Sequence, residues 1–111
     1  MSYEEKLTSH IKRAELALND LRPVQVQKFA ERYYRGDWRT SSVPDLLADL
    51  IQEVGELAQE LRSPWRVEEI AAEAADVANY AAMIADMIKS RAKTSVSVSK
   101  LPSARIAAST C

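Results

Sequence analysis

The chain has too few cysteines and histidines for several common kinds of site. Its 111 residues include one cysteine, Cys111, and one histidine, His10. A lone cysteine cannot form a disulfide within the chain, which fits a reducing compartment, and zinc sites built from Cys and His are excluded. A di-iron bundle needs Glu-x-x-His on two helices, but no histidine follows Glu53 or Glu73 at three residues. A di-iron site of this kind is therefore excluded too.

Long apolar runs and an excess of basic residues are also absent. No run approaches the roughly 20 residues of a membrane-spanning helix, and the first five residues lack the features of a signal peptide. Fifteen Lys and Arg stand against sixteen Asp and Glu, a formal net charge of -1. Proteins that bind nucleic acid nonspecifically usually carry a basic excess. We therefore expect a cytoplasmic protein that binds neither membranes nor nucleic acid.

Apolar residues recur at helical spacing, and no alternating pattern typical of a strand occurs before residue 94. This pattern predicts an all-α fold, a bundle of four main helices. Pro23 should break the first helix, because proline lacks an amide donor and disfavours helix at the preceding residue, Arg22. Ser42 is expected to cap the third helix. The predicted helices cover residues 3–21, 23–35, 43–62 and 67–93.

This organisation predicts an N-terminal helix over residues 1–22, a core over 23–93 and a tail over 94–111. The tail is rich in Ser, Ala and Lys without a sustained period. Val96 and Val98 alternate with serines and could form a short edge strand, but we predict a disordered or extended tail.

The third and fourth predicted helices carry matching pairs of acids. Glu53 and Glu56 flank the apolar stripe of one helix, and Glu73 and Asp76 repeat the pattern twenty residues later. If the two helices pack as an antiparallel pair, which a short connection favours, the four carboxylates converge. Clustered acids repel one another unless a cation or protons neutralise them, and oxygen ligands suit Mg²⁺ bound together with phosphates. The alternative is that these acids form a solvated helix face.

Basic residues on the second predicted helix could supply the complementary charge. Lys28, Arg32, Arg35 and Arg39 step by four, three and four residues. Lys28, Arg32 and Arg35 are candidates to bind phosphate oxygens, whereas Arg39 lies beyond Gly36 and could leave that face.

Two further residues are candidates for substrate contact. Trp38 lies in the break between helices, where a large aromatic side chain either covers the core or stacks on a base. Asn79 lies one turn after Asp76, and its amide on an Ala-rich face requires hydrogen-bond partners, which a sugar or base could provide. Tyr33 and Tyr34 are adjacent, so at most one faces the core and the other could face a nucleotide or a partner.

The acidic pattern resembles a known family. Gln52-Glu53-Val54-Gly55-Glu56-Leu57, followed by Glu73-Ala74-Ala75-Asp76-Val77 with sixteen residues between Glu56 and Glu73, is similar to the ExxE…ExxD signature of the all-α, MazG-like nucleoside triphosphate pyrophosphatases. The run Asp76-Val77-Ala78-Asn79-Tyr80 with Met83-Ile84-Ala85-Asp86, and the Lys28, Arg32, Arg35 and Trp38 spacing before it, resemble phage-type members. The resemblance covers residues 24–88.

This resemblance implies that Glu53, Glu56, Glu73 and Asp76 bind Mg²⁺, for which Mn²⁺ can substitute, with Glu53 and Glu56 as catalytic residues. It implies hydrolysis of a nucleoside triphosphate to a monophosphate and pyrophosphate, with purine substrates such as dGTP or GTP favoured. If the chain is phage-encoded, it would act in the host cytoplasm. Gln52 departs from the pattern, because many members have a second acid there. Glu60, one helical turn after Glu56, is a possible substitute for the acid that is missing at position 52.

The amphipathic stripes also predict self-association. Four helices with broad apolar stripes would expose more apolar surface than a small monomer leaves in water. We expect a homodimer or homotetramer, and members of the family are likewise helical oligomers. The alternative function is a non-catalytic helical interaction or regulatory module, which predicts weak, unselective Mg²⁺ binding and no triphosphate turnover.

Overall fold

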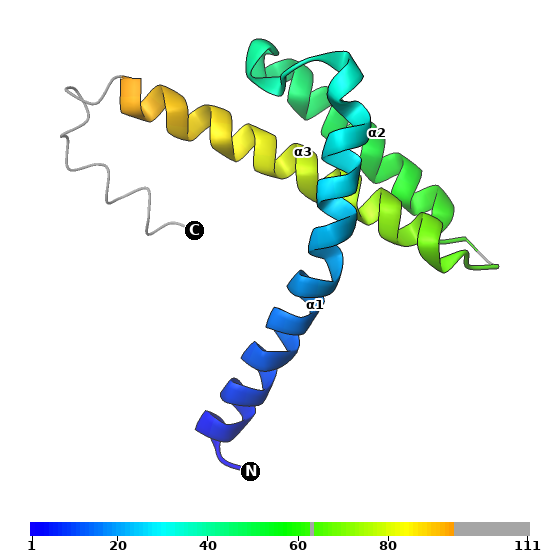
Figure 1. Ribbon diagram of the computed structural model, residues 1–111. Coiled ribbons are helices and arrows are strands. Elements are labelled where there is room, and N and C mark those ends of the chain that lie inside the picture. Colours follow the sequence, from blue (N-terminus) through cyan, green and yellow to red (C-terminus); the bar gives the residue numbers. More distant parts are fainter. Residues whose placement is uncertain (63, 95–111) are drawn as a thin grey trace.

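The computed structural model describes residues 1–62 and 64–94. They form three α-helices and two short 3₁₀ turns, and no strand occurs within these ranges (Figure 1). The predicted all-α class is therefore confirmed. Of the tail predicted over residues 94–111, Thr94 is the last residue of the last helix, and residues 95–111, with the possible edge strand, lie outside the described residues. None of the described helices is long and apolar enough to cross a membrane. The elements are α1 (Tyr3–Arg32), η1 (Tyr33–Arg35), η2 (Trp38–Thr40), α2 (Val43–Glu60) and α3 (Val67–Thr94).

The first two predicted helices are one continuous helix, so the predicted break at Arg22 is wrong. Pro23 lies inside α1, which runs on to Arg32. A proline removes one backbone hydrogen bond and crowds the preceding turn, which can kink a helix without ending it. The bundle thus has three α-helices in place of four, and the turn η1 covers the last three residues assigned to the second predicted helix.

Side-chain caps define where α1 and α2 begin. Ser2 and Glu5 form a reciprocal capping box: the Glu5 amide donates to Ser2 Oγ at 3.1 Å and the Ser2 amide donates to Glu5 Oε1 at 2.8 Å. Ser42 caps α2 as predicted, accepting a hydrogen bond from the Asp45 amide at 3.1 Å. Between the helices, Gly36 takes a φ of 94°, a value that side chains with a Cβ rarely adopt.

The core lies between α2 and α3, which pack side by side (Figure 1). Leu46, in the first turn of α2, is buried against Tyr80 and Met83 in the second half of α3. Phe29 of α1 and Trp38 of η2 pack against this cluster from the outside. The α2–α3 pair is therefore apolar and closed where the start of α2 meets the middle of α3.

Helix α1 crosses α3 and is held there by a pair of amides. The Asn79 side chain is buried, donates from Nδ2 to the Gln25 carbonyl at 2.9 Å and accepts from Gln25 Nε2 at 3.1 Å. Beyond this crossing, α1 leaves the rest of the protein, and every residue from 1 to 20 is exposed (Figure 1). The radius of gyration is 17.5 Å, compared with about 13 Å for a compact chain of roughly 100 residues.

Leu46→Ala should destabilise the fold strongly, because Leu46 is 1% exposed and its truncation leaves a cavity in a small core. We expect a loss of about 2–5 kcal/mol in the free energy of unfolding, measured by urea denaturation. Leu16→Ala makes the same chemical change on α1, where the side chain is 52% exposed, and should cost less than about 1 kcal/mol. Equal losses in the two variants would contradict this placement of the core.

Candidate metal and phosphate site

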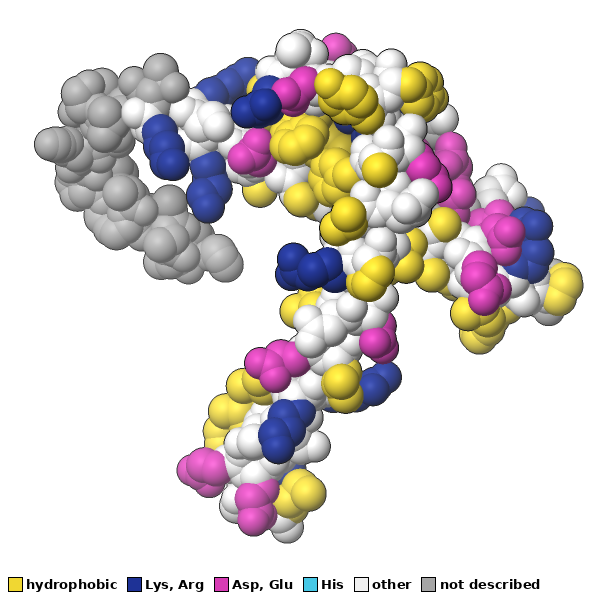
Figure 2. All heavy atoms as spheres, in the orientation of Figure 1, with side chains coloured by type: hydrophobic (Ala, Val, Ile, Leu, Met, Phe, Trp, Pro, Cys, Tyr) yellow, Lys and Arg dark blue, Asp and Glu magenta, His cyan; other side chains and the backbone are white. Residues whose placement is uncertain are grey.

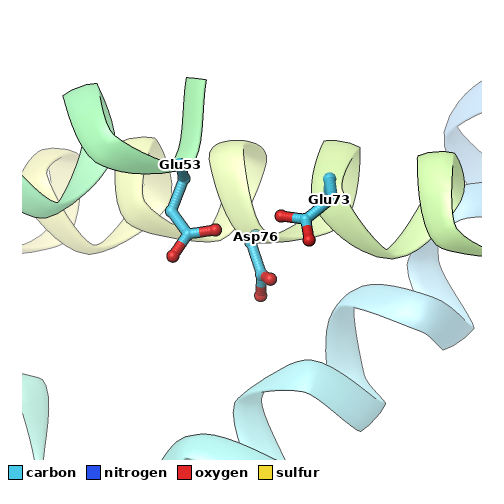
Figure 3. A group of neighbouring side chains, drawn as sticks. All are labelled: Glu53, Glu73 and Asp76. Atoms are coloured by element: carbon cyan, nitrogen blue, oxygen red, sulfur yellow. The ribbon is translucent and has the colours of Figure 1, made fainter. Parts of the chain in front are cut away.

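Three carboxylates from two helices meet about two turns along the α2–α3 pair from the apolar core. Glu53 comes from α2, and Glu73 and Asp76 come from α3, three residues apart and so on one helix face. Each offers one carboxylate oxygen, and these oxygens all lie within 4.8 Å of one another. Figure 3 shows the three side chains extending to the same side of the pair. The predicted convergence of acids from the two helices is thus found for three of the four.

Glu56, the fourth predicted acid, adjoins this cluster without joining it. Its Oε2 accepts a hydrogen bond from Gln52 Nε2 at 3.3 Å, and its negative charge contributes to the raised pKa values of Glu53 and Glu73. Gln52 occupies the position where the resembling family often has an acid. In this chain it orients Glu56, one helical turn away.

Two oxygens of the cluster lack partners within the described residues. Oε1 of Glu53 and Oε1 of Glu73 are both buried and accept no hydrogen bond. Most buried polar atoms in native proteins are paired, since an unpaired acceptor forfeits the hydrogen bonds that water gave it. Two such oxygens from neighbouring acids are suited to share a hard cation.

The pKa values of all three acids are raised. Burial, followed by the charges of Asp76 and Glu56, raises the pKa of Glu53 to about 8. Burial also raises the pKa of Glu73, with help from Glu56 and Asp76. For Asp76, burial raises the pKa although the nearby Lys28 opposes the shift. The cluster is therefore short of positive charge, and a cation would hold these groups ionised.

Lys28 is the cation nearest to the acids. Its Nζ lies 3.5 Å from Asp76 Oδ2 and 3.3 Å from Glu31 Oε1. Burial alone would lower the pKa of Lys28, but Asp76 and Glu31 more than offset this and raise it. Lys28 thus stays charged beside the cluster while neutralising only one of its three acids.

Two arginines converge on the hydroxyl group of a buried tyrosine, Tyr80. Arg35 Nη1 and Arg32 Nε donate to the Tyr80 hydroxyl at 3.0 and 3.3 Å. The Arg32 guanidinium also lies 5.2 Å from the centre of the Tyr80 ring. Sequence reasoning missed Tyr80 as a site residue, although its place one turn after Asp76 puts it on the same helix face. Tyr34 accepts a hydrogen bond from Arg35 Nε at 3.3 Å and is 81% exposed.

These groups enclose a cavity of about 210 Å³. Cations from α1 and η1 line one side, and acids from α2 and α3 line the other. Of the predicted site residues, the structure brings Lys28, Arg32, Arg35, Glu53 and Asp76 together in this cavity. The remaining lining residues are Glu31, Tyr34 and Tyr80.

Two predicted substrate contacts lie elsewhere. The Trp38 ring packs 5.3 Å from the Phe29 ring, and its Nε1 donates to Asp86 Oδ2 at 3.1 Å. Of the two alternatives for Trp38, the structure therefore has it covering the core. Asn79 is buried, and its side-chain amide is engaged with Gln25.

Two other charged residues are engaged in local ion pairs. Arg39 binds Asp37 at 2.6 Å and, by its hydrogen bonds, lowers the pKa of Asp37 to about 2. Arg39 does not line the cavity that holds Lys28, Arg32 and Arg35. Glu60 pairs with Arg66 at 3.0 Å, so it does not replace the acid that Gln52 displaces.

Without divalent cations, the acidic cluster should make the protein less stable as pH rises. The Glu53 pKa is about 8 in the folded state and about 4.5 when unfolded. Between these values the folded state binds more protons, so the free energy of unfolding falls with increasing pH. We expect the melting temperature to fall from pH 5 to pH 8, measured calorimetrically in EDTA, and Mg²⁺ to reduce the fall. Glu53→Gln should flatten the profile, whereas Glu68→Gln, at the exposed start of α3, should not; equal profiles in both would contradict the raised pKa.

Comparison of the chain with models of known protein families, with curated proteins and with solved structures finds no match. The resemblance to the pyrophosphatases therefore depends on the motif residues alone. Function has to be argued from the geometry of the cavity and the chemistry of the groups that line it.

Proposed function

We propose that this protein is a Mg²⁺-dependent nucleoside triphosphate pyrophosphohydrolase, which converts a (deoxy)nucleoside triphosphate and water to the monophosphate and pyrophosphate. The observation that carries the proposal is the cavity in which an acidic cluster with buried, unpaired oxygens faces Lys28, Arg32 and Arg35. A cation between the acids and a polyanion against the bases would satisfy both sides. The site-residue spacing of the pyrophosphatases adds support to this choice of reaction.

The donor set fits a hard divalent ion. Glu53, Glu73 and Asp76 offer only oxygen, and Glu56 stands close enough to act as a fourth ligand or through water. Among the described residues, no histidine or cysteine joins these acids as a ligand, which disfavours the softer transition metals. When bound, Mg²⁺ or Mn²⁺ would neutralise the phosphates and lower the pKa of a water molecule.

The chain's own residues would bind and orient the triphosphate. The guanidinium groups of Arg32 and Arg35 can each bind phosphate oxygens through more than one N–H, and Lys28 adds a point charge beside them. In the reaction, the water oxygen bonds to the α-phosphorus, and the bond from that phosphorus to the bridging oxygen breaks, releasing pyrophosphate. Glu56, oriented by Gln52, is positioned at the edge of the cluster to accept the proton of the water.

The cavity has room for phosphates but not for a whole nucleotide. Its volume is about 210 Å³, whereas pockets that enclose drug-sized ligands usually exceed about 300 Å³. The base would then lie outside, over the exposed ring of Tyr34 at the rim. Stacking on an aromatic ring tolerates every base, and the larger purine rings of dGTP or GTP would overlap Tyr34 most.

We also propose that the protein acts in the cytoplasm as a homodimer or homotetramer. The outer face of α2 carries an apolar row that no other described helix covers. Its members are at least 48% exposed and recur at steps of four, three and seven residues: Leu47, Ile51, Val54 and Leu61. A row of this kind on a small protein marks an interface between subunits.

Loss of one cluster acid should abolish turnover without unfolding the protein. We expect Glu53→Gln and Asp76→Asn to lose at least about 100-fold in kcat, because each removes a charged ligand. Glu68→Gln serves as the matched control and should retain activity. A screen of all ribo- and deoxyribonucleoside triphosphates with Mg²⁺ and Mn²⁺ would record pyrophosphate against orthophosphate. Activity retained in both site variants, or no triphosphate turnover by the wild type, would instead favour an interaction module.

Loss of one guanidinium should weaken triphosphate binding more than it slows the chemistry. For Arg35→Ala we expect KM to rise by about tenfold or more, because a charge-assisted contact to phosphate disappears. Arg35→Lys should recover part of the loss, since it restores charge but not the fork of donors. Arg66→Ala removes an exposed arginine paired with Glu60 and should leave KM unchanged. A similar KM for Arg35→Ala and wild type would place the phosphates elsewhere.

A further inference from the structure

The N-terminal half of α1, residues 3–21, is a helical arm that projects from the rest of the protein (Figure 1). Figure 2 shows apolar side chains on the surface of the arm. Among the exposed apolar residues of the arm are Leu7 at 42%, Ile11 at 47% and Leu18 at 62%. The arm lies outside residues 24–88, which carry the resemblance to the pyrophosphatases. Its role is therefore a separate matter from the chemistry of the cavity.

The apolar residues of the arm form one straight stripe. Leu7, Ile11, Ala14, Leu18 and Leu21 are separated by steps of four, three, four and three, the spacing by which helices pack in pairs. At 100° per residue, Gln25 points in the same direction as Leu7. The second half of α1 turns this same face to α3 through Gln25. The arm thus continues a packing face beyond the end of its partner.

An uncovered stripe of this length requires a partner. Most of the stability of helices in proteins comes from packing of the apolar face. No other described helix covers the arm, where every residue from 3 to 20 is exposed.

We propose that the arm pairs antiparallel with the arm of a second copy of this chain. With the twofold axis between Lys12 and Arg13, Leu7 lies opposite Leu18 of the second copy and Ile11 lies opposite its Ala14. Each pair of opposed residues on one side of the twofold axis recurs on the other side, as an isologous contact requires. The ends close with Tyr3 beside Leu21 of the second copy, one turn before α1 reaches its own α3.

The charges that border the stripe favour this antiparallel register. On one border of the stripe Glu4 faces Arg22 of the second copy, since both side chains point about 60° from Leu7 around the helix. The pair occurs twice by symmetry, so the dimer gains two contacts of opposite charge. In a parallel pair, residues of equal number lie side by side, and Glu4 would be more than ten residues from Arg22. Charged borders of this kind select the orientation of paired helices.

The shape of the protein also favours antiparallel over parallel pairing of the two arms. All of α2 and α3 lie at the C-terminal end of the arm (Figure 1), so antiparallel pairing separates the two bodies while parallel pairing would crowd them together. The arm is roughly 28 Å long at 1.5 Å per residue. A two-helix contact of this length falls at the low end of stable interfaces, and a concentration-dependent equilibrium is expected. The pairing buries a surface distinct from the outer row of α2.

Sedimentation velocity and light scattering over a range of concentrations test this pairing. Ile11→Asp should abolish one association step, giving monomers in place of dimers or dimers in place of tetramers. Leu16→Asp puts the same charge on the opposite side of the arm and should leave the mass unchanged. Circular dichroism checks that both variants keep the helices of the body. A wild type that stays monomeric, or an Ile11→Asp variant with unchanged mass, would overturn the proposal.

A charge swap tests the register. Glu4→Lys and Arg22→Glu should each weaken the association by about tenfold, since each dimer exchanges two attractions for two repulsions. The double variant Glu4→Lys/Arg22→Glu restores opposite charges and should recover the affinity of the wild type. Failure of the double variant to recover would overturn the antiparallel register. These measurements report mass and not turnover, so their outcome does not depend on the proposed hydrolase activity.

Discussion

Mutual repulsion among the acids on one flank of α2 and α3 is the constraint to which the rest of the site responds. Glu53, Glu73 and Asp76 are held within reach of one common ion, and two of their oxygens are buried without partners. The fold tolerates this because Leu46 and Met83, about two turns away along the same helix pair, join the two helices in a well-buried core. The apolar contact brings the two helices together, and that proximity creates the charge density. The raised pKa values follow from it.

Helix α1 determines how much of the negative charge of the acids is neutralised by basic residues of the same chain. The amides of Gln25 and Asn79 set the point at which α1 crosses α3. From that point, Lys28 follows by one turn and Arg32 by two, so both face the acids and Tyr80. Lys28 meets only Asp76 among the cluster acids, while both arginines rest on an uncharged hydroxyl. The arrangement leaves an unmatched cation pair on one side of the cavity and unmatched carboxylates on the other, as expected of a site for a metal and a polyanion.

Features that depend on local spacing were predictable from the sequence, and features that depend on the crossing of α1 and α3 were not. The Ser42 cap and the matched acids twenty residues apart depend on helical period, and the structure has both. The continuity of α1 through Pro23 could not be predicted from spacing, because a proline inside a helical pattern can either kink the helix or end it. The sequence indicates that Asn79 is a polar residue that requires hydrogen-bond partners, but only the crossing of α1 and α3 shows that Gln25 provides them. Tyr80 and Trp38 likewise acquire their roles from segments more than forty residues away.

The unbroken course of α1 also links the two proposed roles of this helix. Had Pro23 ended the helix, the N-terminal arm could adopt many directions relative to the cavity. Because the helix continues, the stripe of Leu7 to Leu21 keeps a fixed orientation to Lys28 and Arg32 on the same rod. A second copy bound to the arm would therefore stabilise the helical state of the whole rod, including the turn that presents the cations. In this arrangement self-association and phosphate binding share one element, although the residues that perform them do not overlap.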